Sequence, residues 1–213
     1  MKMWKSMAVL GISLGMSAAA WADGALLTKV QNLEESSSAT LTAQNLKTWK
    51  RLSFNATNLV VKNGEIIINS VKVGPIIQQD LMAAEKMVEV NFSIRVLEPA
   101  TPKAVLQTLV VLDSAVNAEK SNLVSCRVGK DHIRFADDKP VAITPDENGN
   151  INVKVLVDVA RGMSEFYVNG AVDPVIIRKA LAINKGDAKV SFGDGSSAIE
   201  GSCAIISAEV KEY

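Results

Sequence analysis

The feature that most constrains the fold is a strict alternation of apolar and polar residues over short segments. A period of two sends successive side chains to opposite faces of a strand, so this pattern predicts β-strands with one buried side and one solvent-facing side. Met87–Leu97 alternates most cleanly, and Ile151–Gly170 reads as a hairpin of the same kind. In the first segment, the residues expected to face solvent are Glu89, Asn91, Ser93 and Arg95.

Turn residues separate these segments along the chain. Asn63-Gly64 and Gly129-Lys130-Asp131 each stand between two apolar runs and predict hairpins, because such residues accept a tight-turn backbone. Gln78–Met87 is the main exception, since it has no β-branched residue and is expected to form a short helix or a structured loop. About ten short strands with few helical stretches favour a sandwich or barrel over a parallel α/β sheet.

The N-terminus has the pattern of a secretory signal. Lys2 and Lys5 precede the uncharged, mostly apolar run Met7–Ala20, and Ala20-Trp21-Ala22 fits a small-residue cleavage site. Cleavage after Ala22 is favoured over an uncleaved anchor, because the run is shorter than the ~20 residues that span a bilayer. We therefore expect residues 1–22 to be a signal peptide and the protein to be secreted or periplasmic, with no membrane span in the mature chain.

The rest of the chain is expected to hold an N-terminal arm, residues 23–50, and one β-domain, residues 51–213. The chain contains 23 Lys and Arg residues against 23 Asp and Glu residues. Removing Lys2 and Lys5 with the signal leaves a slightly acidic protein without a basic stripe. Nucleic acid is therefore excluded as an expected partner, because binding it requires many cations that neutralise phosphates.

Two cysteines, Cys126 and Cys203, lie in expected strands. An even number of cysteines in an exported protein favours a disulfide, and two separate buried thiols are the alternative. Sequence does not give the distance between the two Cα atoms, which decides whether a bridge is possible. Cys126–Cys203 is thus a candidate disulfide, with both interpretations open at this point.

Several short motifs in the last third resemble a known group of domains. The strand Val153–Val159 is followed by a Tyr-Val-Asn-Gly hairpin end in Glu165–Gly170, and a Phe-Gly-Asp turn in Val190–Ser197 precedes a closing strand. With these motifs, Leu52–Val210 resembles the concanavalin A-like and laminin G-like jelly-roll domains. The resemblance implies an all-β, two-sheet antiparallel jelly-roll sandwich, with a short N-terminal arm and at most one or two short helices. It also implies carbohydrate binding as the usual role, and calcium in many members.

Carbohydrate recognition usually involves exposed aromatic side chains, and this chain has few. Tyr167 is the one aromatic residue expected on a solvent-facing side, because it alternates with Phe166 and Val168. Asn169 and Asp194 each precede a glycine at the end of a strand, where turn formation alone explains both residues. Tyr167, Asn169 and Asp194 are the candidate ligand-binding residues. The phenylalanines expected in the core are Phe54, Phe92, Phe135, Phe166 and Phe192.

No set of residues in the sequence amounts to a catalytic site. Glycoside hydrolysis needs paired carboxylates, and the E-x-D-x-x-E pattern of sandwich glucanases is absent, with Glu89 standing alone in its strand. The single histidine, His132, lies in an expected hairpin, where a structural role is the more common one. No metal or other cofactor is predicted, because the loop acids do not form a dense calcium-ligand cluster. These acids are Asp113, Asp137, Asp138, Asp146 and Glu147.

Three functional hypotheses follow. The favoured one is an exported, non-catalytic binding module that recognises a glycan or a cell-surface protein through loops at the sandwich edge. The second is a structural or interaction protein of the cell envelope without a small ligand. An enzyme that degrades polysaccharide is the third, and the missing carboxylate pattern counts against it.

Overall fold

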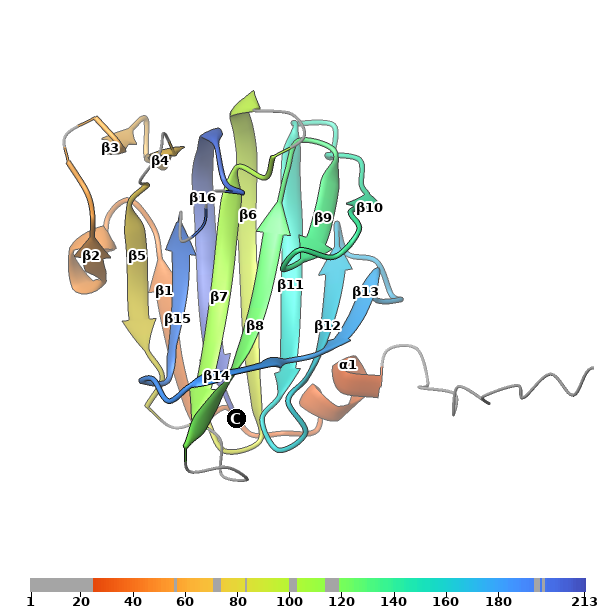
Figure 1. Ribbon diagram of the computed structural model, residues 1–213. Coiled ribbons are helices and arrows are strands. Elements are labelled where there is room, and N and C mark those ends of the chain that lie inside the picture. The colour runs from red at the N-terminus through yellow and green to blue at the C-terminus, as the bar shows by residue number, and fades with distance from the viewer. Residues whose placement is uncertain are drawn as a thin grey trace, which may run out of the picture.

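Strands dominate the computed structural model, which describes residues 25–55, 57–70, 74–82, 84–99, 103–113, 119–193, 196 and 198–213 (Figure 1). The expected signal peptide lies outside the described residues. The elements are α1 (Ala25–Val30), β1 (Ser37–Leu41), the 3-10 helix η1 (Leu46–Thr48), β2 (Lys50–Leu52), β3 (Leu59–Lys62), β4 (Glu65–Ser70), β5 (Ile76–Asp80), β6 (Met87–Pro99), β7 (Leu106–Asp113), β8 (Lys120–Val128), β9 (His132–Phe135), β10 (Val141–Ala142), β11 (Asn150–Asp158), β12 (Met163–Val168), β13 (Ile176–Lys179), β14 (Leu181–Asn184), β15 (Lys189–Gly193) and β16 (Gly201–Glu212).

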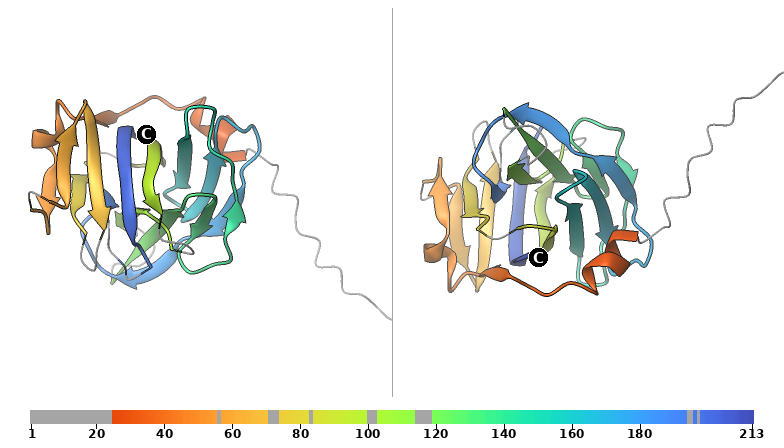
Figure 2. Two further views of the ribbon diagram at one scale, coloured as in Figure 1. Left: turned by 90° about the horizontal axis from the view of Figure 1, so that it is seen from above. Right: turned by 90° about the horizontal axis from the view of Figure 1, so that it is seen from below.

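The strands form two sheets of eight strands each, stacked as the two layers of a sandwich (Figures 1 and 2). Sheet A has the order β13-β12-β11-β6-β16-β4-β3, with β1 also paired to β16. Sheet B has the order β10-β9-β8-β7-β15-β5-β2, with β14 also paired to β8. The described strand pairs within these sheets are antiparallel, so the predicted all-β, two-sheet antiparallel sandwich is confirmed.

The core lies between the sheets and follows from the alternation in the strands. Val88, Val90 and Ile94 of β6 are fully buried on the inner side of sheet A. Three aromatic rings join the layers: Phe92 of β6 meets Phe192 of β15 edge-on at 5.6 Å, and Trp49 lies 6.0 Å from Phe192. These rings connect sheet A, sheet B and the segment before β2 in one cluster.

Two details of the fold differ from the sequence-based expectations. Gln78–Met87 was expected to be a helix or loop, but Gln78–Asp80 continues β5, which pairs with β15 on one side and β2 on the other. Backbone pairing on both sides, together with the fully buried Ile77, outweighs the weak β-propensity of the segment. Phe54 was expected in the core, yet it is 49% exposed beyond the end of β2.

Residues 25–50 pack closely against the sandwich. β1 pairs with the C-terminal half of β16, and α1 lies against the outer side of sheet A near β11 and β12 (Figure 2). Leu41 and Trp49 from this segment are buried in the core. The N-terminal part of the described chain therefore helps to build both the core and the outer surface of sheet A.

In the structure Cys126 and Cys203 are separate thiols, which corresponds to the second of the two interpretations, and the candidate disulfide is not formed. Cys126 belongs to β8 of sheet B and Cys203 to β16 of sheet A, and both are buried. Burial disfavours the thiolate, which raises the pKa of Cys126 well above its ordinary value and the pKa of Cys203 to about 12. Both side chains act as small apolar core groups.

Replacing Phe192 by Ala should remove the ring that joins the two sheets. We expect a loss of about 3–5 kcal/mol in the free energy of unfolding, because a large side chain is deleted from a fully buried position. Urea denaturation followed by tryptophan fluorescence measures this loss. The control Phe54→Ala, at an exposed position, should cost less than about 1 kcal/mol; equal losses for both variants would contradict the assigned core.

The cysteine assignment predicts a specific pattern of thiol reactivity. Protein purified without reductant should react with Ellman's reagent at neither cysteine while folded, since both thiols are buried and protonated. After unfolding in guanidinium, both of the chain's 2 cysteines should react. Absence of reactive thiols in the unfolded, unreduced protein would mean that the cysteines are bridged.

Candidate functional site

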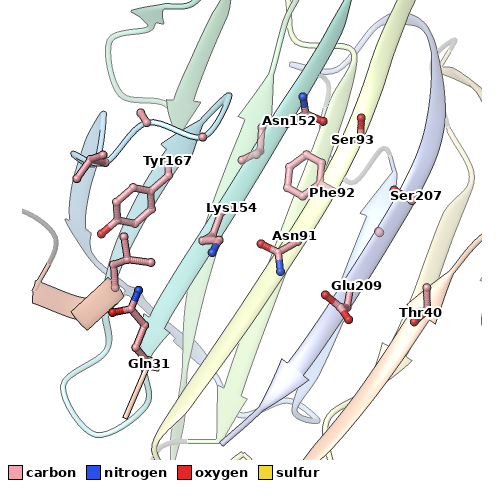
Figure 3. Close-up of a pocket in the computed structure, with 16 residues that line it drawn as sticks. Gln31, Thr40, Asn91, Phe92, Ser93, Asn152, Lys154, Tyr167, Ser207 and Glu209 are labelled. Carbon is pink, nitrogen blue, oxygen red and sulfur yellow. The ribbon is translucent and has the colours of Figure 1, made fainter. Parts of the chain in front are cut away.

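A groove of about 630 Å³ crosses the outer face of sheet A (Figure 3). Its floor is formed by residues of β12, β11, β6, β16 and β1, which are neighbours in the sheet. One end is walled by α1 and by the loop that follows β12. The groove is lined by Leu27, Gln31, Thr40, Asn91, Phe92, Ser93, Asn152, Val153, Lys154, Tyr167, Gly170, Ala171, Val172, Ser207, Ala208 and Glu209.

The strand register places polar side chains in a line across the floor. Lys154 of β11 pairs with Asn91 of β6, which pairs with Glu209 of β16, which pairs with Thr40 of β1. We call these four residues the polar row. Tyr167 of β12 continues the line on the other side, since it pairs with Lys154. Strands lie about 4.8 Å apart, so the line from β12 to β1 is roughly 19 Å long.

A charge network supports the polar row, and the buried carboxylate of Glu89 is at its centre. Glu89, two residues before Asn91 on β6, accepts a hydrogen bond from Asn91 Nδ2 at 2.8 Å and lies 3.3 Å from Lys154 Nζ. Tyr213 donates its hydroxyl to the same carboxylate at 3.1 Å. Burial alone would raise the pKa of Glu89, but the Asn91 bond, the Lys154 charge and the Tyr213 bond outweigh it and hold that pKa below its ordinary value.

The charged side chains of the floor, Lys154 and Glu209, each lie near a group of opposite sign. Lys154 faces Glu89, and Glu209 lies 3.6 Å from Lys211 on the same strand. Glu35 adds a second carboxylate 3.5 Å from Lys211. Each cation therefore has an anionic neighbour, and the groove floor presents paired charges rather than a field of one sign.

Tyr167 lines the groove but is not exposed as predicted. It is on the outer face, as the alternation indicated, yet only 3% of its surface is accessible. Leu26 and Val30 of α1 pack over it, and its hydroxyl donates a hydrogen bond to Glu165 Oε2. Burial and the nearby Glu165 carboxylate raise the pKa of Tyr167 well above its usual value, so the phenol stays protonated and neutral. Tyr167 was expected on a solvent-facing side, and it is buried there because α1 covers this end of the sheet.

The other two predicted ligand residues lie apart from the polar row or outside the described chain. Asn169 takes a left-handed backbone, φ 52°, at the turn after β12. Its side chain ties that turn to the neighbouring chain, because Nδ2 donates to the carbonyl oxygen of Thr144 and Oδ1 accepts from the amide of Asn152 in β11. Gly170, which follows it, lines the groove. Asp194 lies outside the described residues, and its role stays a prediction.

Three of the five acidic residues considered for calcium have other partners. Asp137 pairs with Arg127, and Asp138 pairs with Arg178. Asp146 accepts from the amides of Asn150 and Asn148, and these bonds lower its pKa. Within the part of the chain that the structure describes, no group of three or more His, Cys, Asp or Glu side chains is arranged to hold a metal ion.

The single histidine of the chain, His132, does not lie at the groove. His132 belongs to β9 of sheet B, whereas the groove is on sheet A. Its ring packs so close to Gly129 that a Cβ there would come within 2.1 Å of the ring. It therefore has a packing role in the hairpin and no contact with the groove.

The groove floor includes residues that sequence reasoning did not select. Asn91, Lys154 and Glu209 were not proposed as ligand-binding residues, although Asn91 was placed on the solvent-facing side of its strand. The alternation assigns each of them to the outer face of its own strand. The signal that was missing is the register, which brings residues more than a hundred positions apart into one row.

Two carboxylates near the groove floor, Glu89 and Glu165, can be compared with the paired acid and base of a glycosidase. The general acid of such a site needs a raised pKa, whereas that of Glu89 is lowered. Glu165 lies in the same cross-strand line as Glu89, separated by Leu156. However, Glu165 is only 3% exposed and is bound by the amide of Leu26 and by Tyr167 under α1. The groove can instead offer amide, hydroxyl and charged groups to hydrogen-bond a polar ligand.

Comparison with known proteins places the fold. No protein-family model matches the chain, and neither does any curated protein sequence. Among solved structures, a β-glucanase from Bacillus licheniformis is similar over 84% of this chain and 100% of its own, with 12% identity and a TM-score of 0.53. A native glycosidic hydrolase is similar over 82% of this chain and 95% of its own, with 9% identity and a TM-score of 0.52. A sialidase matches 84% of this chain but only 18% of its own, at 13% identity and a TM-score of 0.50. The chain thus has the concanavalin A-like jelly-roll fold.

The Glu89 network predicts a pH-dependent contribution to stability. Because the pKa of Glu89 is lowered in the folded protein, its stabilisation is present above the unfolded pKa and is lost as the pH falls through the folded value. Glu89→Gln should reduce the free energy of unfolding at pH 7 by on the order of 1 kcal/mol, and this difference should shrink below about pH 4. Urea denaturation of both proteins between pH 3 and pH 7 measures it.

The matched control is Glu147→Gln, at an exposed loop position. It should leave the pH dependence of stability unchanged. A Glu89→Gln variant with wild-type stability at pH 7 would show that the network around Glu89 does not favour the ionised carboxylate.

Proposed function

We propose that this chain is an exported, non-catalytic binding module that holds a glycan in the groove on the outer face of sheet A. The observation that carries the proposal is the polar row, a line of side chains aligned across four neighbouring strands. Regular strands position these groups more rigidly than loops would, as a preformed site requires. In this proposal the glycan contacts the face of sheet A, whereas the sequence-based hypothesis placed its contacts on loops at the sandwich edge.

The size and chemistry of the groove suit a sugar ligand. Its volume of about 630 Å³ lies within the roughly 300–1,000 Å³ of small-molecule sites. Asn91 and Thr40 offer uncharged groups to sugar hydroxyls, while Lys154 and Glu209 offer charged ones. Since Lys154 at the floor and Lys211 beside it already have carboxylate neighbours, the groove favours a polar ligand of low net charge over a polyanion.

The solved structures of similar fold agree with this class of ligand. Two of them are named as a β-glucanase and a glycosidic hydrolase, which are enzymes that act on glycans. Their identity to this chain is too low to transfer an activity, so the support comes from the shared architecture. The non-catalytic part of the proposal is supported by the lowered pKa of Glu89 and the covered position of Glu165.

Export is the part of the proposal that depends on the N-terminal sequence. Lys2, Lys5 and the apolar run Met7–Ala20 support a cleaved signal, after which the module meets extracellular or periplasmic glycans. Among the described residues, no helix is long and apolar enough to cross a bilayer.

Filling the groove with a large side chain should abolish glycan binding. Ser207 is exposed and lines the groove, so Ser207→Trp should block the site without disturbing the core. On a glycan array, the wild-type protein should bind a defined subset of neutral glycans, and the variant should lose at least tenfold of that signal. Lys62→Trp, at an exposed position of β3 outside the groove, is the matched control and should bind as the wild type does.

Two results would contradict the proposal in different parts. A flat array with wild-type protein would favour a structural or protein-binding role in the cell envelope. Release of new reducing ends from a bound polysaccharide would show that the module is an enzyme.

A further inference from the structure

The two ends of the groove differ in chemistry. The polar row occupies the part over β11, β6, β16 and β1. At the β12 end, the lining is mainly aliphatic and aromatic, with the side chain of Gln31 beside it, and we call these aliphatic and aromatic groups the apolar end (Figure 3). The apolar end consists of Leu27, Tyr167, Ala171 and Val172.

The helix α1 holds one wall of the apolar end in place. Leu26 and Val30 are buried against Met87, Leu156 and Tyr167 on the outer side of sheet A. The amide of Leu26 donates to Glu165, and Lys29 pairs with the fully buried Asp158 at 2.6 Å. These contacts fix the helix, so that Leu27, next to Leu26, is presented to the groove on a supported element.

The opposite wall is an exposed aliphatic side chain. Val172, in the loop between β12 and β13, is 76% exposed and lines the groove. A single exposed valine is ordinary on a protein surface. Val172, however, lines the same end of the groove as Leu27, Ala171 and Tyr167. Together these residues form an apolar surface at that end.

A bare sugar is a poor match for the apolar end. Tyr167 is only 3% exposed and its hydroxyl is already bonded to Glu165, so it offers the ligand no free oxygen. Leu27, Ala171 and Val172 carry no side-chain hydrogen-bonding group. Sugar hydroxyls placed there would lose water without gaining equivalent partners, whereas an acyl or aryl group would bury apolar surface.

We propose that the groove binds a glycan bearing an apolar acyl or aryl substituent, with the sugar on the polar row and the substituent in the apolar end. This inference rests on the proposed glycan-binding function and specifies the class of glycoconjugate. The substituent provides the apolar contact that exposed aromatic side chains provide in other sugar-binding sites, which explains how a groove poor in exposed aromatics binds a glycan.

The test compares glycosides that differ only in their aglycone. Full-length protein is titrated with the methyl and 4-nitrophenyl glycosides of β-D-glucose, β-D-galactose, α-D-mannose and N-acetyl-β-D-glucosamine, and with 4-nitroanisole as the sugar-free probe. Calorimetry or NMR titration gives the dissociation constants. At least one 4-nitrophenyl glycoside should bind about tenfold more tightly than both its methyl counterpart and 4-nitroanisole, because only it contacts both ends.

Two valine variants assign that preference to the groove. Val172→Ser should abolish the advantage of the 4-nitrophenyl glycoside over its methyl counterpart. Val61→Ser is the matched control, because Val61 is 50% exposed on β3 and does not line the groove. This control should keep the full preference.

The possible failures are distinguishable. Equal affinities for methyl and 4-nitrophenyl glycosides would overturn the apolar-substituent inference and leave the glycan-binding proposal intact. Binding of 4-nitroanisole as tight as that of every glycoside would overturn the inference and contradict glycan recognition as well. Binding of no probe at all would overturn both, and a preference retained in Val172→Ser would overturn the assigned location.

Discussion

The structure depends on the two faces of one strand, β6. Its inward residues, Val88, Val90 and Phe92, are locked into the core between the sheets. Its outward residues at the intervening positions, Glu89 and Asn91, form the centre of the groove floor and its support. A shift of one residue would exchange the two sets, so the burial of the core also sets the register of the binding surface. Folding and site formation are thus consequences of the same packing.

The outer face of sheet A can hold charged groups because each has a local partner. Glu89 is nearly buried, and its cost of desolvation is offset by Lys154, Asn91 and the Tyr213 hydroxyl. The same network that stabilises the carboxylate also keeps it ionised, which suits a fixed hydrogen-bond acceptor and not a proton donor. The contacts that stabilise Glu89 at the sheet surface are therefore the same ones that lower its pKa.

Sequence predicted the fold better than the site because alternation is local and register is not. The pattern in Met87–Leu97 identified the outward side of β6, but it did not show that Lys154 and Glu209 lie beside Asn91. For Tyr167 the face was correct and the exposure was wrong, since nothing in its own strand indicates that α1 covers it. Assigning the two cysteines to strands was likewise not enough to decide whether they form a disulfide, because a disulfide depends on the distance between them across the sandwich.

The central claim is that ligand binds on the outer face of sheet A, in a position fixed by the packing of β6. The most direct measurement is amide chemical-shift mapping of isotopically labelled protein during titration with a neutral oligosaccharide positive on the array. The account predicts that the largest shifts occur at Asn91, Lys154 and Glu209, on three adjacent strands. Shifts confined to sheet B, or to turns far from the groove such as Asn63-Gly64, would contradict it.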